Sequence, residues 1–198
     1  MRQIRIIAWV FVAVALVGVG FVLLKGPQPA PPVKTTVMSA NFGGPFTLVG
    51  ADGKPFESSQ LDGKPYALFF GFTHCPDTCP TTLARLVKLR REAGGDGAFK
   101  IVFVTVDPER DGPKEVGAYA KAFGAPIIGL TGSPEQIEAV KKQFGIFSRK
   151  VPIEGGDYTV DHTATVLLFG RDGKFVATLA PDEQDEVALD KIERLTSA

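Results

Sequence analysis

Two kinds of hydrophobic pattern alternate along the chain after residue 40. Continuous apolar runs bounded by turn residues are typical of strands buried on both faces, and they predict three strands: Tyr66–Phe72, Ile101–Val106 and Ile127–Leu130. Apolar residues at helical spacing predict a helix after each of these strands: Pro80–Ala93, Pro113–Phe123 and Pro134–Phe144. Ser133 and Gln136 form a capping-box pattern at the start of the third helix.

Turn residues predict a hairpin at each end of this alternating region. The predicted strands are Phe46–Val49 and Phe56 around Asp52-Gly53, and Ala164–Phe169 and Phe175–Leu179 around Arg171-Asp172-Gly173. A last helix is predicted from about Asp182 to Thr196. Strands that alternate with helices and close on hairpins indicate an α/β domain, in which helices flank a mixed central sheet with an antiparallel edge.

The longest apolar run of the chain lies near its start. No charge occurs in the 19 positions from Ile6 to Leu24, a length that crosses the hydrocarbon core of a bilayer as a helix. A cleaved signal peptide is the alternative, but its apolar stretch is shorter and ends in small residues, whereas this run ends in Leu23-Leu24-Lys25. Arg2 and Arg5 precede the run, so the positive-inside rule predicts a cytoplasmic N-terminus and places the rest of the chain outside.

A spacer and a folded domain are expected after this run. Four prolines occur in the seven residues Gly26–Pro32, a composition that favours an extended linker. We therefore expect a cytoplasmic tip at residues 1–5, one transmembrane anchor at 6–24, a linker at 25–39 and a folded domain at 40–198. This organisation is typical of a bacterial inner-membrane protein with its C-terminal domain in the periplasm, a compartment that oxidises thiols.

Charge and cysteine content exclude two classes of protein. The chain has 22 basic and 22 acidic residues; three basic ones precede residue 26, which leaves 19 against 22, a net charge of −3, for the remainder. A nucleic-acid binder requires a basic patch, so we expect no nucleic-acid partner. Two cysteines are too few for a small domain stabilised by disulfides.

Cys75 and Cys79 follow the strand Tyr66–Phe72 directly, at the start of the predicted helix. The free N–H groups and the macrodipole of a helix N-terminus favour a thiolate, so at least one of the two should be more acidic than a free thiol. Their spacing suits a shared metal ion or a disulfide, but a purely structural disulfide is disfavoured because so short a loop removes little entropy from the unfolded chain. Two sulfur ligands suit copper(I), whereas a structural zinc site requires four ligands.

His74 and His162 are the only histidines that could add an imidazole ligand. His74 precedes Cys75, and because neighbouring side chains alternate in direction, we expect it on the surface or in packing, away from the sulfurs. His162 lies in a predicted loop that enters the strand Ala164–Phe169. Spacing leaves open whether this loop reaches the cysteines, which requires that strand to run antiparallel to Tyr66–Phe72.

Three separated segments resemble signature segments of the Sco/SenC proteins, and they occur in the family's order. The segments are Gly71–Thr81 (GFTHCPDTCPT), Val104–Asp111 (VTVDPERD) and Tyr158–Thr163 (YTVDHT). The resemblance extends from about residue 40 to the end of the chain, and the predicted anchor and linker are also similar to the family's architecture.

The resemblance implies a thioredoxin-like fold in which the loop with His162 lies against the helix start with Cys75 and Cys79. Family members use these positions as copper ligands, so the implied site is Cys75, Cys79 and His162, with the two cysteines as a redox dithiol that forms a disulfide when oxidised. Two thiolates and one imidazole suit copper(I), and a further donor or water would complete a copper(II) site. The implied role is delivery of copper to the CuA centre in subunit II of cytochrome c oxidase, or reduction of the cysteines of that centre. Another periplasmic copper protein is the alternative acceptor.

Other side chains near these segments allow simpler interpretations. Asp161 is a candidate for orienting His162, although an Asp beside a turn is more often a capping or solvated residue. The mixed charges of Asp107–Asp111 favour a strand-to-helix turn over a partner-docking loop. The phenylalanines at positions 69, 70 and 72 are expected in the core and as a hydrophobic wall near the site.

Three other functions share part of these features. A thioredoxin-type oxidoreductase would use Cys75 or Cys79 to attack a partner disulfide, but thioredoxins resemble one another in a C-x-x-C motif and a facing proline, where this chain has a longer spacing and His162. The peroxiredoxin pattern P-x-x-x-T/S-x-x-C precedes neither cysteine. A membrane-tethered docking module would leave the placement of these three residues unexplained. One dithiol can both carry copper and reduce a target, and His162 favours copper handling as the main task.

Overall fold

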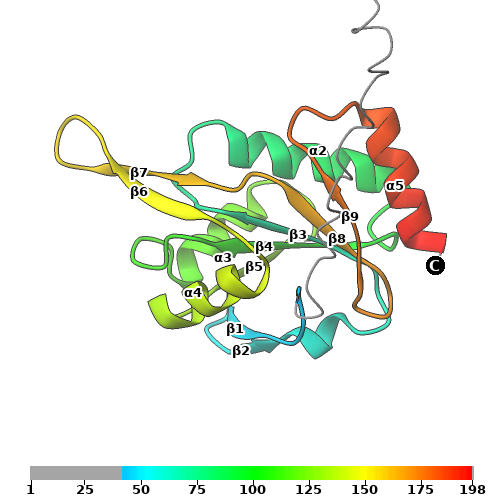
Figure 1. Ribbon diagram of the computed structural model, residues 1–198, viewed down its shortest axis with the longest axis horizontal. Helices are drawn as coiled ribbons and strands as arrows, with labels where there is room; N and C mark the ends of the chain where they lie inside the picture. The colour runs from blue at the N-terminus through cyan, green and yellow to red at the C-terminus, as the bar shows by residue number, and fades with distance from the viewer. Residues whose placement is uncertain (1–41, 198) are drawn as a thin grey trace, which may run out of the picture. The chain divides into compact units, whose positions relative to one another are not determined.

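A mixed sheet forms the centre of the fold in the computed structural model, which describes residues 42–197 (Figure 1). Within these residues the sheet has seven strands in the order β2-β1-β5-β4-β3-β8-β9. The strands are β1 Thr47–Gly50, β2 Pro55–Glu57, β3 Tyr66–Gly71, β4 Lys100–Thr105, β5 Ile128–Thr131, β8 Val166–Phe169 and β9 Phe175–Leu179. Strands β3, β4 and β5 pair in parallel, and all other pairs in this sheet are antiparallel.

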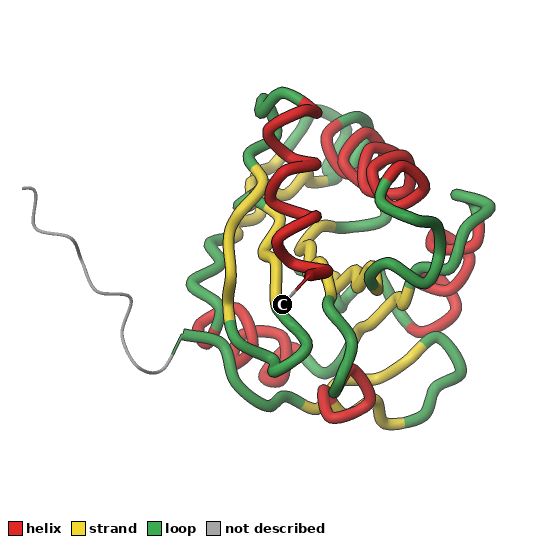
Figure 2. The backbone as a smooth tube through the Cα atoms, turned by 90° about the vertical axis from the view of Figure 1, so that its right-hand side faces the viewer, coloured by secondary structure: helices red, strands yellow, loops and turns green. Residues whose placement is uncertain are grey.

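Helices cover the sheet, and each begins or ends where the sequence predicts within a few residues. They are α2 Thr78–Glu92, α3 Pro113–Lys121, α4 Pro134–Gln143 and α5 Asp185–Ser197, with a short 3-10 helix, η1, at Ser58–Leu61. Helices α2 and α5 lie side by side, as both views show (Figures 1 and 2). The capping box of α4 is present: the Ser133 side chain accepts from the Gln136 N–H, and the Gln136 side chain accepts from the Ser133 N–H.

Aromatic side chains fill both faces of the sheet, because successive residues of a buried strand point to opposite sides. On one face, Phe103 contacts Tyr119 of α3, with ring centroids 5.2 Å apart. On the other face, Phe70 packs against Phe144 at the end of α4, with ring centroids 5.9 Å apart. All six residues of β3 are buried. The central strand is therefore held rigidly, and the segment that follows it starts from a fixed point.

A second sheet, which the sequence analysis missed, consists of β6 (Ser148–Pro152) and β7 (Tyr158–His162). These two strands pair antiparallel with each other and extend from the main body as an arm (Figure 1). The prediction that His162 lies in a loop is wrong, because His162 is the last residue of β7 and pairs with Ser148. Both strands carry mostly exposed or half-buried polar side chains, so the sequence has no alternating hydrophobic pattern that predicts them.

The prediction of an α/β domain with helices around a mixed sheet is confirmed, and so is the N-terminal hairpin, in which Thr47 pairs with Glu57. The predicted cytoplasmic tip, the anchor at 6–24, the whole linker at 25–39 and the first two residues of the predicted domain lie outside the described residues. In the part of the chain that the structure describes, no helix has the length and apolar character needed to cross a membrane.

Candidate metal centre

Cys75, Cys79 and His162 come together in the structure. Their ligand atoms, two sulfurs and one imidazole nitrogen, all lie within 4.8 Å of one another. The Nε2 atom of His162 is 3.4 Å from the Cys79 sulfur, although the two residues are 83 positions apart in the chain. Both cysteines are free thiols; Cys79 is fully buried and Cys75 is half-buried.

The end of β3 and the start of α2 place the two sulfurs. The predicted helix begins two residues earlier than expected, so that Cys79 lies in its first turn while Cys75 precedes it. The N–H of Cys79 donates to the Cys75 sulfur over 3.3 Å. Asp77, the N-cap residue, makes no capping hydrogen bond with its side chain. The Cys75 sulfur therefore serves as an acceptor for a helix N–H group that would otherwise lack one.

Gly71 makes room for the buried sulfur. A Cβ atom at this position would lie 2.8 Å from the Cys79 sulfur and 3.0 Å from the ring of Phe103. Both neighbours are fully buried and have no free space to move into. Glycine at the end of β3 thus allows the helix that carries Cys79 to approach the sheet closely.

The pKa values of the two thiols are shifted in opposite directions. Hydrogen bonds, first from the Cys79 thiol and also from the backbone N–H groups of Cys79 and Asp77, lower the pKa of the Cys75 thiol to about 4. The hydrogen bond to Cys75 and burial both raise the pKa of the Cys79 thiol. Of the two thiols, Cys75 is therefore the one that favours the thiolate form. The lowered pKa of Cys75 agrees with the expectation that at least one cysteine is more acidic than a free thiol, although its largest cause is the Cys79 side chain and not the helix N-terminus.

His162 presents one ring nitrogen to the sulfurs and uses the other to hold its orientation. Its Nδ1 atom is 3.0 Å from the carbonyl oxygen of Thr163, which can only accept, so Nδ1 carries the proton and Nε2 of the neutral ring has a free lone pair. The ring meets Phe69 and Phe72 edge-on, with centroids 6.2 and 5.8 Å away. These phenylalanines form the predicted hydrophobic wall.

Antiparallel pairing of β3 with β8 explains how His162 reaches the cysteines. Leu68 of β3 pairs with Leu167 of β8, so the start of β8 lies toward the end of β3, where the cysteine segment begins. His162 comes shortly before β8 and is therefore delivered to the same edge of the sheet. The condition that the sequence left open is satisfied.

A buried carboxylate, which sequence reasoning treated as part of a turn, supports the cysteine segment. Asp111 is fully buried; it accepts from the N–H of Thr73 at 2.8 Å, the hydroxyl of Thr73 at 2.6 Å and the hydroxyl of Thr105 at 2.6 Å. Because β3 and β4 are parallel neighbours, the segments after them meet at one edge of the sheet. That adjacency was the signal that could have identified Asp111.

The two remaining candidates, His74 and Asp161, lie beside the site but do not belong to the group of converging ligand atoms. His74 has a side chain 55% exposed, and its Nδ1 is 3.2 Å from the hydroxyl of Thr73, which agrees with the expected surface position. Asp161 forms an exposed ion pair with Arg149 at 2.7 Å. The group that orients His162 is the carbonyl of Thr163 and not the side chain of Asp161.

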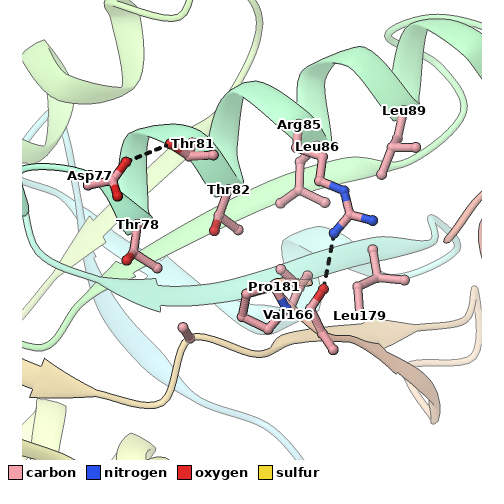
Figure 3. A pocket seen from close by; sticks show the side chains of 12 residues that line it. Asp77, Thr78, Thr81, Thr82, Arg85, Leu86, Leu89, Val166, Leu179 and Pro181 are labelled. Atoms are coloured by element: carbon pink, nitrogen blue, oxygen red, sulfur yellow. Dashed lines mark hydrogen bonds between the residues drawn. The ribbon is translucent and has the colours of Figure 1, made fainter. Parts of the chain in front are cut away.

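Two hollows open beside the site. One, of about 270 Å³, is lined by residues of both segments, including Phe72, Cys75, Pro76 and His162, and it connects these ligands to the surface. The other, of about 170 Å³, lies between α2 and the segment Ala164–Pro181; Leu86 and Val166 line it, and the Arg85 guanidinium donates to the Ala180 carbonyl at its end (Figure 3). Neither cysteine nor histidine lines the second hollow, so of these two hollows the first is the one that gives access to Cys75 and His162.

Comparison with known proteins identifies the family. The family model described as SCO1/SenC matches residues 34–197. The chain belongs to the SCO1/SenC family. This membership, with the structural likeness below, confirms the resemblance of the three sequence segments and the thioredoxin-like type of its α/β fold.

Relatives with known structures or names agree with this assignment. The structure of Bradyrhizobium japonicum ScoI with copper bound is 40% identical, with a TM-score of 0.70, and the match covers 78% of this chain and 99% of that one. BsSco, a member of the Sco family of cytochrome c oxidase assembly proteins in which a disulfide switch was identified, is 27% identical, with a TM-score of 0.60 and coverage of 80% and 96%. The mitochondrial SCO1 homolog 1 of Arabidopsis thaliana is 43% identical over 69% of this chain and 42% of its own length. This chain thus spans less than half of that relative. Copper binding is a property of Sco proteins similar to this one.

Proposed function

We propose that this protein carries copper at Cys75, Cys79 and His162 and delivers it to the CuA centre of cytochrome c oxidase subunit II or to another periplasmic copper protein. The observation that carries the proposal is the convergence of two sulfurs and a free imidazole nitrogen within 4.8 Å beside an open cleft. This donor set suits copper(I), which is satisfied by two or three soft ligands. The copper in the similar Bradyrhizobium structure supports it.

The surroundings of the three ligands suit the loading and release of a metal ion. Because thiolates are the metal ligands and the pKa of the Cys79 thiol is raised, binding copper by both sulfurs requires Cys79 to release a proton, so metal uptake is coupled to proton release. Phe69 and Phe72 shield the imidazole, while the half-buried Cys75 faces the cleft. An acceptor's ligands can therefore approach on the Cys75 side while Cys79 and His162 still hold the ion.

Copper titration of the reduced full-length chain under anaerobic conditions tests this function, with affinity read by competition against a chromophoric copper(I) chelator. We expect one copper per chain, no high-affinity binding in Cys75→Ala or Cys79→Ala, and an affinity lowered by at least about tenfold in His162→Ala, since even an outer partner of a metal ligand contributes about 10- to 100-fold. His74→Ala is the matched control, because it removes an imidazole next to Cys75 that does not face the sulfurs. Equal affinities of His162→Ala and wild type would refute the three-ligand site.

A second function, reduction of a partner disulfide, is favoured by the unequal acidity of the two thiols. The Cys75 thiolate would attack one sulfur of the partner and release the other as a thiol, and Cys79 would then attack Cys75, freeing the partner. Two electrons pass to the partner, and this chain is left with a Cys75–Cys79 disulfide. The disulfide switch of the similar BsSco supports this alternative. A reduced protein that binds no copper tightly but exchanges rapidly with a disulfide peptide would favour it over copper transfer.

We further propose that residues 6–24 anchor the protein in a bacterial inner membrane, with the domain in the periplasm. The apolar run and the arginines before it support this location. Fractionation of cells with a carbonate wash, together with protease access from the periplasmic side, tests it.

A further inference from the structure

The hairpin that carries His162 depends on side chains for its position. Strands β6 and β7 hydrogen-bond to each other and do not join the seven-stranded sheet within the described residues. The backbone ladder that fixes β3 and β8 therefore does not fix β7. The β3–β8 pairing brings His162 to the right edge of the sheet, and side-chain contacts of the arm have to hold it in place there.

Arg110, in the turn between β4 and α3, makes that connection. Its Nη1 atom donates to the carbonyl of Tyr158 at 2.9 Å and to Asp157 at 3.2 Å, so one guanidinium nitrogen holds the first residue of β7 and the residue before it. The guanidinium also stacks over the Tyr158 ring, with its carbon 3.8 Å from the centroid. The Arg110 side chain is only 18% exposed.

Asp107 contacts both Arg110 and Tyr158 through its carboxylate. One of its carboxylate oxygens accepts from Arg110 Nε at 2.5 Å, and the other accepts from the Tyr158 hydroxyl at 2.9 Å. The side chain of Asp107 is fully buried, and the backbone N–H of Asp107 donates to the Thr105 hydroxyl oxygen. The same Thr105 hydroxyl donates to Asp111, the carboxylate that supports the cysteine segment. One turn therefore contacts both segments that carry the proposed ligands.

Strand geometry transmits this contact to His162. Tyr158, Val160 and His162 are alternate residues of β7, so their side chains point to the same side of the strand, toward the main body. Val160 between them is buried. If Tyr158 were released, β7 could shift relative to the main body, and His162 at its end would no longer be held 3.4 Å from the Cys79 sulfur.

We propose that Arg110, held by Asp107 and stacked on Tyr158, is a positioning residue that sets the place of His162 in the copper site. This inference rests on the proposed function, because it assigns Arg110 a role through one of the proposed ligands. The arrangement fixes the third ligand before the metal arrives, as outer partners of metal ligands do in other sites.

A double-mutant cycle on the reduced full-length chain tests the proposal, with copper(I) affinity measured by chelator competition. We expect Arg110→Lys, which keeps the charge but loses the planar fork, to weaken copper binding about tenfold. In a His162→Ala background the same substitution should cause no further loss, because its target is gone. Tyr158→Phe, a milder change that removes only the hydroxyl bond to Asp107, should weaken binding in the same direction and also lose its effect without His162.

Matched controls separate positioning from general damage. Arg85 is equally exposed, at 18%, and pairs with Asp185 and two backbone carbonyls between α2 and α5, so Arg85→Lys should leave copper affinity unchanged. Tyr66→Phe, at the opposite end of β3, is the control for Tyr158→Phe.

Three results would overturn the proposal. Wild-type affinity in Arg110→Lys and Tyr158→Phe, with weak binding in His162→Ala, would remove the positioning role and leave the copper site intact. Equal losses with and without His162 would mean that Arg110 acts by another route. Wild-type affinity in His162→Ala would refute the three-ligand site itself and the positioning role with it.

Discussion

Replacing Asp111 should lower the free energy of unfolding and should also disturb the cysteine segment. The carboxylate is fully buried and accepts three hydrogen bonds, two from Thr73 and one from Thr105. In Asp111→Ala the Thr73 hydroxyl can turn to His74 Nδ1, 3.2 Å away, but the Thr73 N–H and the Thr105 hydroxyl lose their acceptor. Each buried donor without a partner costs about 1–3 kcal/mol, so the expected loss in the free energy of unfolding is about 3 kcal/mol.

Asp111→Asn should have a smaller effect. The amide keeps one acceptor oxygen, and its NH2 group can donate to a threonine hydroxyl, which is free to rotate. What disappears is the charge, and hydrogen bonds to a charged acceptor are about twice as strong as neutral ones. We expect a loss of about 1–2 kcal/mol, offset in part because a neutral group is less costly to bury.

Urea unfolding of the reduced, metal-free protein, followed by circular dichroism, measures these losses. Copper titration of the same variants should show weaker binding in Asp111→Ala, because Thr73 lies two residues before Cys75. Asp190→Ala removes an exposed carboxylate on α5 and serves as the control. If Asp111→Ala unfolds within about 0.5 kcal/mol of wild type, the range of ordinary surface substitutions, the hydrogen-bond network does not stabilise the fold as argued.

The remaining predictions concern single residues of the site and one helix cap. Because the pKa of Cys75 is lowered to about 4, iodoacetamide should label Cys75 at pH 6 while Cys79 stays unlabelled, and mass spectrometry can locate the label. Labelling of Cys75 that begins only above about pH 8, as for a free thiol, would contradict this prediction. Gly71→Ala forces a Cβ to 2.8 Å from the Cys79 sulfur and should cost about 1–3 kcal/mol in urea unfolding, with weaker copper binding; an unchanged affinity would show that the sulfur moves freely. Ser133→Ala removes a capping box that contacts none of the three proposed ligands, and it should lower the free energy of unfolding by about 1 kcal/mol with no change in copper affinity. A changed affinity would argue against separate roles.

The sequence predicts the parts of the fold in which burial is one-sided or complete. Continuous apolar runs identify β3 and β4 because both faces of these strands are covered, and the cap at Ser133 identifies the start of α4. The β6–β7 hairpin was not predicted because most of its side chains are polar and exposed or half-buried, so its strands show no apolar stripe. Its one local signal is the Gly155-Gly156 turn between the two strands, where both glycines have positive φ.

The three candidate ligands are implied by a family resemblance, whereas the residues that hold them in place do so through long-range contacts. Asp107 and Asp111 read as charged turn residues, since a charge run is usually solvated; their burial depends on donors from Thr73, Thr105 and Tyr158 that only the fold brings near. The carbonyl that orients His162 is a backbone atom, which no residue type reveals.

His162 and Cys79 are 83 positions apart in the chain, so the affinity of the proposed site for a metal depends on whether the domain is folded. In an unfolded chain nothing holds His162 beside the two sulfurs, and it comes to the Cys79 sulfur when β8 pairs with β3. A metal that binds the native state tenfold more tightly stabilises it by about 1.4 kcal/mol at saturation. The proposed copper site thus couples metal retention to folding: a chain in which β8 has not paired with β3 should hold the ion less tightly than the folded chain does.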